Sequence, residues 1–253
     1  MIRGIVFDLF DTLVDQNHAR LPFVEHEGRR IGPTTTSLHR HLVGTVGLSL
    51  SLGEFADLQQ QVDRALFRET LKVGIELPTL RRFEVLAVQL GVDSETALAR
   101  ELTAIHMGML RDAVSVPEHH EAILASLAVD HRLGLCSNFS HGETARAILD
   151  AAGLTEHFQA LVISEDLGIR KPRPEIFESV ARALDLAPDE ILHVGDNLQA
   201  DVGGAAACGM RTVWLTRQIE DPDALLARYA GPPPDFALED LTDLPVLVAR
   251  LSV

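Results

Sequence analysis

The chain has 253 residues, of which 46% are apolar, and its 22 basic and 37 acidic side chains give a net charge of −15. This length suits one large domain or a main domain with an insert, and the acidic balance argues against binding a nucleic-acid backbone, which needs a basic face. Two cysteines form no disulfide framework and no apolar run approaches the roughly 18 residues of a membrane helix, so we expect a cytoplasmic protein without a signal peptide or a membrane partner.

The first predicted element is a buried strand over residues 2–7, which is rich in β-branched and aromatic residues and ends at Asp8. The region 16–111 then has few strand-like runs. Apolar residues at three- and four-residue spacing predict amphipathic helices over 52–74, 80–91 and 94–114. Ser94 is expected to cap the last of these, and the Gly- and Pro-containing stretch 26–37 is predicted to be a loop. We therefore assign 16–111 to an inserted α-helical cap.

The remaining segments, 1–15 and 112–253, alternate between strand and helix patterns. Further strands are predicted at 133–138, 160–166, 191–196 and 211–216. Helices are predicted at 141–154, 174–186 (with Pro174 in the first turn) and 199–210, and the tail 231–251 is expected to form a loop, a short strand and a closing helix. This alternation predicts an α/β core with a Rossmann-like parallel sheet and helices on both faces.

Polar residues end three of the predicted strands. They are Asp8 after the first, Ser137 and Asn138 after the second, and Asp196 after the fourth, with Asp201 five residues further on. Ligands of parallel sheets bind at the carboxyl ends of the strands, which points to one site, although each residue alone could be a turn former or a helix cap. Carboxylates brought together must protonate or share a cation, and Mg²⁺ suits such ligands. Lys171 offers a positive charge for an anion, or is a solvated loop residue.

Four segments, FDLFDTLVD, LCSN, GIRKPRPEIF and HVGDNLQADVGGAAACGM, follow one another along the chain. In this order and spacing they resemble the motifs of the haloacid dehalogenase-like (HAD) hydrolase superfamily. The helical insert after the first strand resembles the first-type (C1) cap of that superfamily. The resemblance implies an HAD fold and a hydrolase that acts through an aspartate nucleophile.

The resemblance also implies roles for single residues. Asp8 would be the nucleophile, Thr12 would support its loop, Ser137 and Asn138 would hydrogen-bond the transferring group, and Lys171 would neutralise charge. Mg²⁺ would be held by Asp8, the backbone carbonyl of Phe10, Asp196 and Asp201. The implied substrate is a small phosphorylated metabolite. The sequence predicts no oligomeric state.

Phe10 departs from the pattern of the superfamily's phosphatases, which carry there a second Asp as general acid and base. Asp11, the next residue, should point in another direction and is not expected to replace it. An aromatic at this position resembles the metal-independent 2-haloacid dehalogenases, whose leaving halide needs no proton. The acidic fourth motif argues against that alternative, and Arg20, Arg29 and Arg30 lie in no recognisable substrate-binding context. We favour a phosphatase, with a dehalogenase or a non-enzymatic binding protein as alternatives.

Eleven histidines are many for this length, and the stretches HRH (His39–His41) and EHH (Glu118–His120) could suggest metal ligands. No pair shows the i, i+4 helix spacing of a zinc site with a third partner in view, so helix-face or surface histidines are the favoured interpretation. His193 lies inside a predicted strand and is expected to be a core residue.

Overall fold

The computed structural model describes residues 1–92 and 95–251, and its contacts divide the chain into two compact units. One unit consists of Met1–Asp15 and Ser115–Val253, and the other of Gln16–Val114. The chain passes between them through two short paired strands, β2 (Asp15–Gln16) and β5 (Val114–Ser115). The helical insert was predicted over 16–111, so its predicted end lies three residues before the end of the second unit. Ser94, which was predicted to cap the start of a helix, lies outside the described residues.

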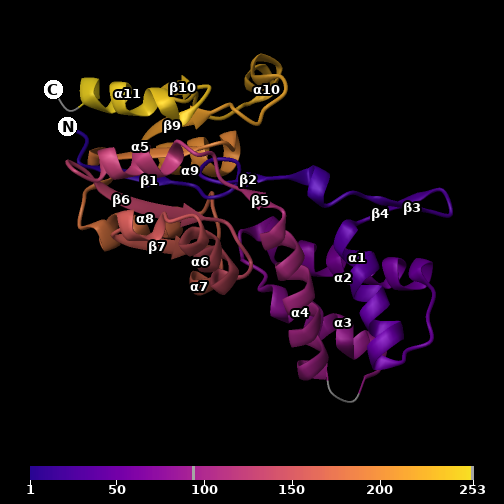
Figure 1. The fold of residues 1–253 in the computed structure, drawn as a ribbon. Helices are drawn as coiled ribbons and strands as arrows, with labels where there is room; N and C mark the ends of the chain where they lie inside the picture. The colour runs from indigo at the N-terminus through magenta and orange to yellow at the C-terminus, as the bar shows by residue number, and fades with distance from the viewer. Residues whose placement is uncertain (93–94, 252–253) are drawn as a thin grey trace. The chain divides into compact units, whose positions relative to one another are not determined.

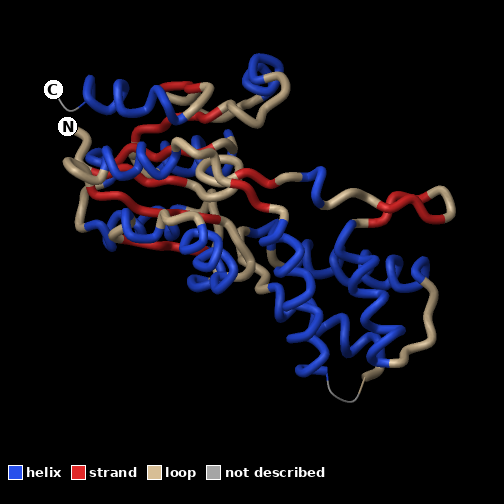
Figure 2. The backbone as a smooth tube through the Cα atoms, in the orientation of Figure 1, coloured by secondary structure: helices blue, strands red, loops and turns tan. Residues whose placement is uncertain are grey.

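The first unit is built on a six-stranded parallel sheet, which confirms the predicted α/β fold class (Figures 1 and 2). Its strands are β1 (Gly4–Phe7), β6 (Arg132–Ser137), β7 (Ala160–Ile163), β8 (Ile191–Gly195), β9 (Arg211–Leu215) and β10 (Phe236–Leu238), in the spatial order β10-β9-β8-β1-β6-β7. Strand β1 lies at its centre, where Phe7 pairs with Leu135 of β6 and Val194 of β8. The loops after these three central strands therefore leave the sheet side by side.

Helices flank the sheet in this unit (Figure 1). They are α5 (His120–Leu127), α6 (Gly142–Ala151), the short α7 (Ser164–Leu167), α8 (Pro174–Leu184), a π-helical turn (Leu198–Gly203), α9 (Gly204–Ala207), α10 (Pro222–Arg228) and α11 (Leu244–Leu251). Helix α8 begins with Pro174 at its first turn, as predicted, and buries Phe177 and Val180 in a cluster with Val6 of β1 and Cys136 of β6. This packing holds the segment that precedes α8, and Lys171 within it, close to the sheet.

The second unit has its own apolar core. Its helices are α1 (Pro33–His41), which continues as a π-helical turn, α2 (Leu52–Glu69), α3 (Thr79–Leu90) and α4 (Glu95–Asp112). Leu38, Phe55, Phe83 and Leu102 lie at the centre of the cluster that these helices bury. Ser51 starts α2 with a capping box, because its side chain accepts from the Glu54 N–H and the Glu54 carboxylate accepts from the Ser51 N–H.

Two local predictions were wrong. The stretch 26–37 is not a loop, because β3 (Val24–His26) and β4 (Arg29–Ile31) form a hairpin and α1 starts at Pro33. Glu27 and Gly28 both have positive φ, which is the geometry of a tight two-residue hairpin turn. The strand predicted over 160–166 ends at Ile163 and gives way to α7.

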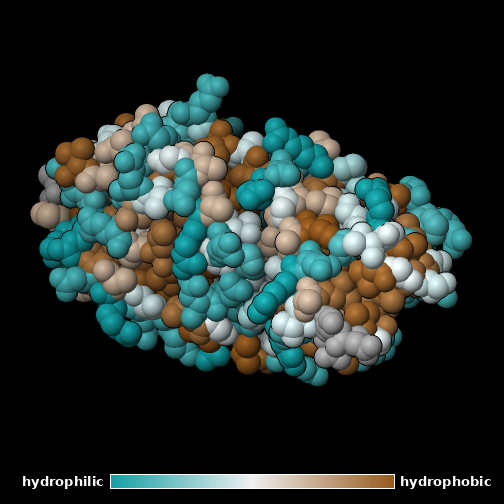
Figure 3. All heavy atoms as spheres, turned by 60° about the horizontal axis from the view of Figure 1, so that its bottom comes forward, coloured by the Kyte–Doolittle hydropathy of each residue, from teal (hydrophilic) through white to brown (hydrophobic). Residues whose placement is uncertain are grey.

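No helix in the described part of the chain is long and apolar enough to cross a bilayer. Figure 3 shows one face of the molecule, on which hydrophilic residues are interspersed with small hydrophobic patches.

Candidate active site

Asp8 directly follows the central strand β1 and is almost fully buried. Its backbone N–H donates to the carbonyl of Val194, so the ladder between β1 and β8 fixes the start of the loop. Its carboxylate oxygen Oδ1 accepts a hydrogen bond of 2.5 Å from Lys171 Nζ. Burial raises the pKa of Asp8 to about 6, with Lys171 opposing the rise and Asp201 adding to it.

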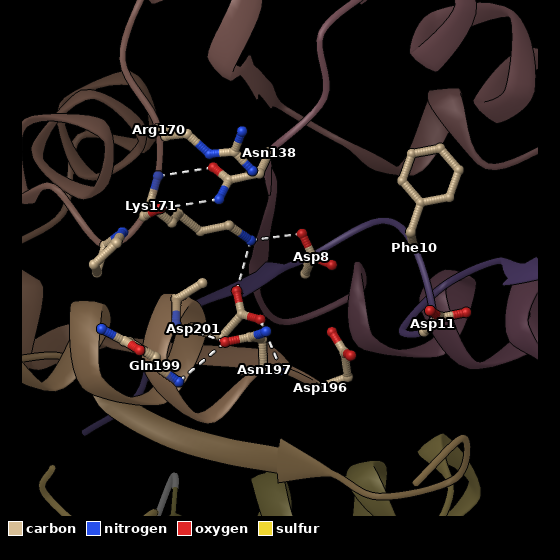
Figure 4. A pocket seen from close by; sticks show the side chains of 12 residues that line it. Asp8, Phe10, Asp11, Asn138, Arg170, Lys171, Asp196, Asn197, Gln199 and Asp201 are labelled. Atoms are coloured by element: carbon tan, nitrogen blue, oxygen red, sulfur yellow. Dashed lines mark hydrogen bonds and ion pairs between the residues drawn. The ribbon is translucent and has the colours of Figure 1, made fainter. Parts of the chain in front are cut away.

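Lys171 joins two carboxylates. Its buried Nζ donates to Asp8 Oδ1 at 2.5 Å and to Asp201 Oδ1 at 2.6 Å (Figure 4). Burial alone would lower the pKa of this ammonium, but the two carboxylates outweigh it and hold the pKa above its usual value. Asn138 fixes the lysine backbone, since its Oδ1 accepts from the Lys171 N–H at 2.7 Å and its Nδ2 donates to the Lys171 carbonyl at 3.0 Å.

Asp201 is held from three sides. Besides the bond from Lys171, Oδ1 accepts from His193 Nε2 at 3.0 Å, and Oδ2 accepts from the Asn197 N–H at 3.1 Å. Burial would raise the pKa of Asp201, but Lys171 and His193 hold it below its usual range. His193, predicted to be a core residue, is fully buried and in addition supports this carboxylate.

Asp196 follows β8, and no described residue hydrogen-bonds its carboxylate. Burial, Asp8 and Asp201 together raise its pKa to about 8. One oxygen from each of Asp8, Asp196 and Asp201 lies within 4.8 Å of the others. Three carboxylates are balanced here by a single lysine, which leaves an excess of negative charge when all are ionised. Oxygen ligands at this spacing fit a hard divalent cation such as Mg²⁺, which would offset that excess.

Phe10 points away from the carboxylate cluster (Figure 4). Its ring lies against that of Phe139, with the ring centroids 4.7 Å apart and the planes tilted by 42°. Asp11 adopts a left-handed backbone conformation (φ 57°), and its side chain lies apart from the group formed by Asp8, Lys171 and Asp201. Neither side chain therefore stands beside Asp8 as a general acid.

The cluster opens into a pocket of about 360 Å³. Its lining residues are Asp8, Phe10, Asp11, Asn138, Arg170, Lys171, Pro172, Asp196, Asn197, Gln199, Ala200 and Asp201. Ser137 and Thr12 are not part of this lining, and the hydroxyl of each is buried without a hydrogen bond to any described residue. Their hydroxyls are therefore available to the loop or to a bound group.

Sequence reasoning did not single out Arg170, Asn197 or Gln199, which also line the pocket. Arg170 lies in the segment GIRKPRPEIF, and Asn197 and Gln199 lie in HVGDNLQADVGGAAACGM. Their position inside these motifs could have indicated that they belong to the site. The support that His193 gives to Asp201 had no such signal, because it depends on how the π-helical turn folds back on β8.

The three arginines weighed as substrate ligands have partners within the helical unit. Arg29 pairs with Asp57 at 2.5 Å, and Arg20 donates to the carbonyls of Asp112 and Val114. Arg30 lies over the ring of Phe23, at 4.3 Å from its centroid.

The chain is similar in sequence and in fold to known proteins. The family profile of the haloacid dehalogenase-like hydrolases matches residues 2–209. The chain is 28% identical to the glyceraldehyde 3-phosphate phosphatase of Methanopyrus kandleri, over all of this chain and 99% of that protein. It is 27% identical to an (S)-2-haloacid dehalogenase of a Pseudomonas species, over 99% of this chain and 98% of the other. A crystal structure of a 2-haloacid dehalogenase from Pseudomonas syringae pv. tomato shares the fold, with a TM-score of 0.75, 24% identity and coverage of 99% and 100% of the two chains.

Proposed function

The chain belongs to the haloacid dehalogenase-like hydrolases, and from this premise we propose that it is a Mg²⁺-dependent phosphatase of small phosphorylated metabolites. The observation that carries the proposal is the cluster of Asp8, Asp196 and Asp201, whose oxygens lie within 4.8 Å of one another. A metal-independent enzyme would have no need to keep Asp196, a carboxylate without a hydrogen-bond partner among the described residues and with a pKa raised to about 8.

In the proposed reaction Asp8 is the nucleophile. Lys171 holds its Oδ1, which leaves Oδ2 to form a bond to phosphorus while the bond to the leaving oxygen breaks. Water then attacks the aspartyl phosphate, so that inorganic phosphate leaves and the carboxylate is restored. The amide of Asn138, which lines the pocket, would bind the phosphoryl oxygens, and we assign the same role to the buried hydroxyl of Ser137, which has no partner among the described residues.

The residues that would hold the cation are Asp8, the backbone carbonyl of Phe10, Asp196 and Asp201. Bound there, Mg²⁺ would neutralise charge on the phosphoryl group during its transfer. Lys171 contributes a fixed positive charge through its bonds to Asp8 and Asp201. The leaving oxygen receives no proton from residue 10, so its proton must come from water.

Phosphate release from a panel of phosphorylated metabolites, glyceraldehyde 3-phosphate among them, tests the proposal. We expect release with Mg²⁺, none after chelation, and none from Asp8→Asn. Asp11→Asn is the matched control and should remain active. Failure to release phosphate from any substrate, or equal release by Asp8→Asn, would contradict a phosphatase.

A 2-haloacid dehalogenase is the second candidate, and the Phe10–Phe139 pair favours it. The two rings, tilted against each other, offer an apolar surface that suits a halide, which leaves without a proton. This candidate predicts halide release from 2-chloropropionate that a chelator does not affect and that Asp196→Asn retains. Halide release that requires Mg²⁺, or none at all, would remove it.

A further inference from the structure

We propose that His119, His120 and Asp240 form a second metal site, for a divalent transition-metal ion of the zinc class, separate from the three carboxylates of the active site. A ring nitrogen of each histidine and a carboxylate oxygen of Asp240 lie within 4.8 Å of one another. His120 is the first residue of α5 and His119 directly precedes it, whereas Asp240 lies 121 residues after His119 and precedes a 3₁₀ turn (Leu241–Asp243). The fold thus joins residues that are far apart in sequence.

His120 has the hydrogen-bonding state of a metal ligand. Its Nδ1 lies 2.8 Å from the carbonyl oxygen of Leu13, which can only accept, so Nδ1 carries the proton. Nε2 then has a free lone pair, and this buried atom has no hydrogen-bond partner among the described residues. A neutral imidazole whose other nitrogen donates to a backbone carbonyl is the usual arrangement of a histidine bound to a metal.

His119 and Asp240 supply the other two ligands. His119 Nε2 lies 2.7 Å from Asp240 Oδ1, and both side chains are partly exposed, so an ion can reach them from solvent. In a tetrahedral zinc site two ligand atoms lie about 3.3 Å apart, so a small outward movement of these side chains is enough. Coordination through His119 Nε2 requires this nitrogen to give up its proton, either to Nδ1 of the same ring or to solvent.

Neighbouring residues orient the carboxylate. Asp240 Oδ1 accepts from both the N–H and the hydroxyl of Thr242, which restricts its rotation. Arg217 pairs with Asp15 through one hydrogen bond of 2.7 Å and a second ion-pair contact of 2.7 Å. Its Nε lies 3.6 Å from Asp240 Oδ2. The guanidinium is thus already neutralised by Asp15, which reduces its repulsion of a cation near Asp240.

The ligand set selects the metal. Two imidazoles and one carboxylate suit zinc-class ions, and three protein ligands leave a fourth position for water. Mg²⁺ prefers oxygen ligands in octahedral geometry and is not expected here. The active-site cluster, made of carboxylates alone, has the opposite preference.

Co²⁺ is the probe for this site, because tetrahedral Co²⁺ with nitrogen ligands absorbs visible light far more strongly than octahedral Co²⁺ with oxygen ligands. The titration is made on the whole protein in excess Mg²⁺, which occupies carboxylate sites. We expect intense visible absorbance that saturates at one equivalent of Co²⁺ and disappears when Zn²⁺ displaces the Co²⁺. His119→Gln and Asp240→Asn should each weaken binding by more than about 100-fold, the upper end of what loss of an outer-shell partner costs.

His26→Gln is the matched control and should bind Co²⁺ like the unmodified chain. His119 is the preferred variant because its side chain is half exposed, whereas replacing the buried His120 could unfold the protein. Absence of intense absorbance, or an equal signal from His119→Gln and Asp240→Asn, would show that the cluster is an ion pair only and overturn the proposal. Because the measurement is Co²⁺ absorbance and not phosphate release, its result does not depend on whether the protein is a phosphatase.

Discussion

The ring of Phe10 packs against the ring of Phe139, with their centroids 4.7 Å apart, at the position where a phosphatase of this family would need a proton donor. Both residues belong to the loops that leave the central strands β1 and β6. The side chain of residue 10 points away from Asp8, so in the proposed reaction the leaving group has no protein acid at this position (Figure 4).

Replacing Phe10 with Asp should raise the turnover of alkyl phosphates. A positioned acid contributes about 10²–10⁴-fold, and the gain should be small for aryl phosphates, whose leaving group needs no proton. Steady-state kinetics on both substrate types measures this. Phe10→Asn is the control, with similar size and no acid. An equal gain in both variants would mean that relief of the aromatic contact, rather than proton donation, is responsible.

Lys171→Met should destabilise the protein strongly. It leaves Asp8 and Asp201 buried without their shared cation, and loss of one partner of a buried ion pair costs about 3–5 kcal/mol. Urea unfolding measures the change. Arg173→Met, in the same segment but in an exposed pair with Glu175, should change stability by about 0–1 kcal/mol. Adding Asp8→Asn to Lys171→Met should recover part of the loss, and no recovery would contradict the assigned pairing.

Without divalent cations, stability should fall as pH rises from about 4 to about 8. The pKa of Asp196 is raised to about 8 in the folded chain, so the native state binds more protons than the unfolded state within this window. The slope of unfolding free energy against pH is therefore negative there. Mg²⁺ should bind more tightly towards high pH and reverse the trend. Denaturation at several pH values tests this, and Asp196→Asn should show a flatter profile; an unchanged profile would assign the effect elsewhere.

His193→Phe should weaken Mg²⁺ binding by about 10–100-fold, because His193 Nε2 donates to Asp201 Oδ1 at 3.0 Å and fixes its orientation. His193→Gln can place a donor at a similar position and should remain close to the unmodified protein. Calorimetric Mg²⁺ titration and the Mg²⁺ dependence of activity provide the readout. If both variants lose stability alike and bind Mg²⁺ normally, His193 is a packing residue only.

Gly204→Ala should destabilise the first unit by about 1–3 kcal/mol through overpacking. A Cβ at this position would lie 2.6 Å from Cε2 of the buried Phe177 and 3.0 Å from the backbone Cα of Pro172. Pro172 follows Lys171, so turnover should fall as well. The control is Gly108→Ala in α4, where a Cβ meets nothing within 4 Å and the helix should gain about 0.5–1 kcal/mol. Thermal unfolding of both variants measures the two changes in stability, and an unchanged stability of Gly204→Ala would contradict the prediction.

Secondary structure was predicted most accurately from the sequence where the local residue pattern and the tertiary packing favour the same element. Helix α8, with Pro174 at its start and a regular apolar stripe, was predicted to within two residues. The hairpin β3–β4 was not, because strands of three residues are too short to show alternation. In the site, position in a motif indicated Asp8, Lys171, Asp196 and Asp201. The contacts of His120 with Leu13 and of His119 with Asp240 join segments that are far apart in the sequence, so no local sequence pattern predicts them.

The central place of β1 has a consequence for how the protein is made. Ile5, Val6 and Phe7 are fully buried, yet their partners in β6 and β8 are synthesised only after the whole helical insert. During translation this apolar strand must wait unpaired, and such non-local pairing is slow and exposes chains to aggregation. Asp8, the proposed nucleophile at the end of β1, is therefore synthesised before the helical insert but can reach its native surroundings only after β6 and β8 have been made.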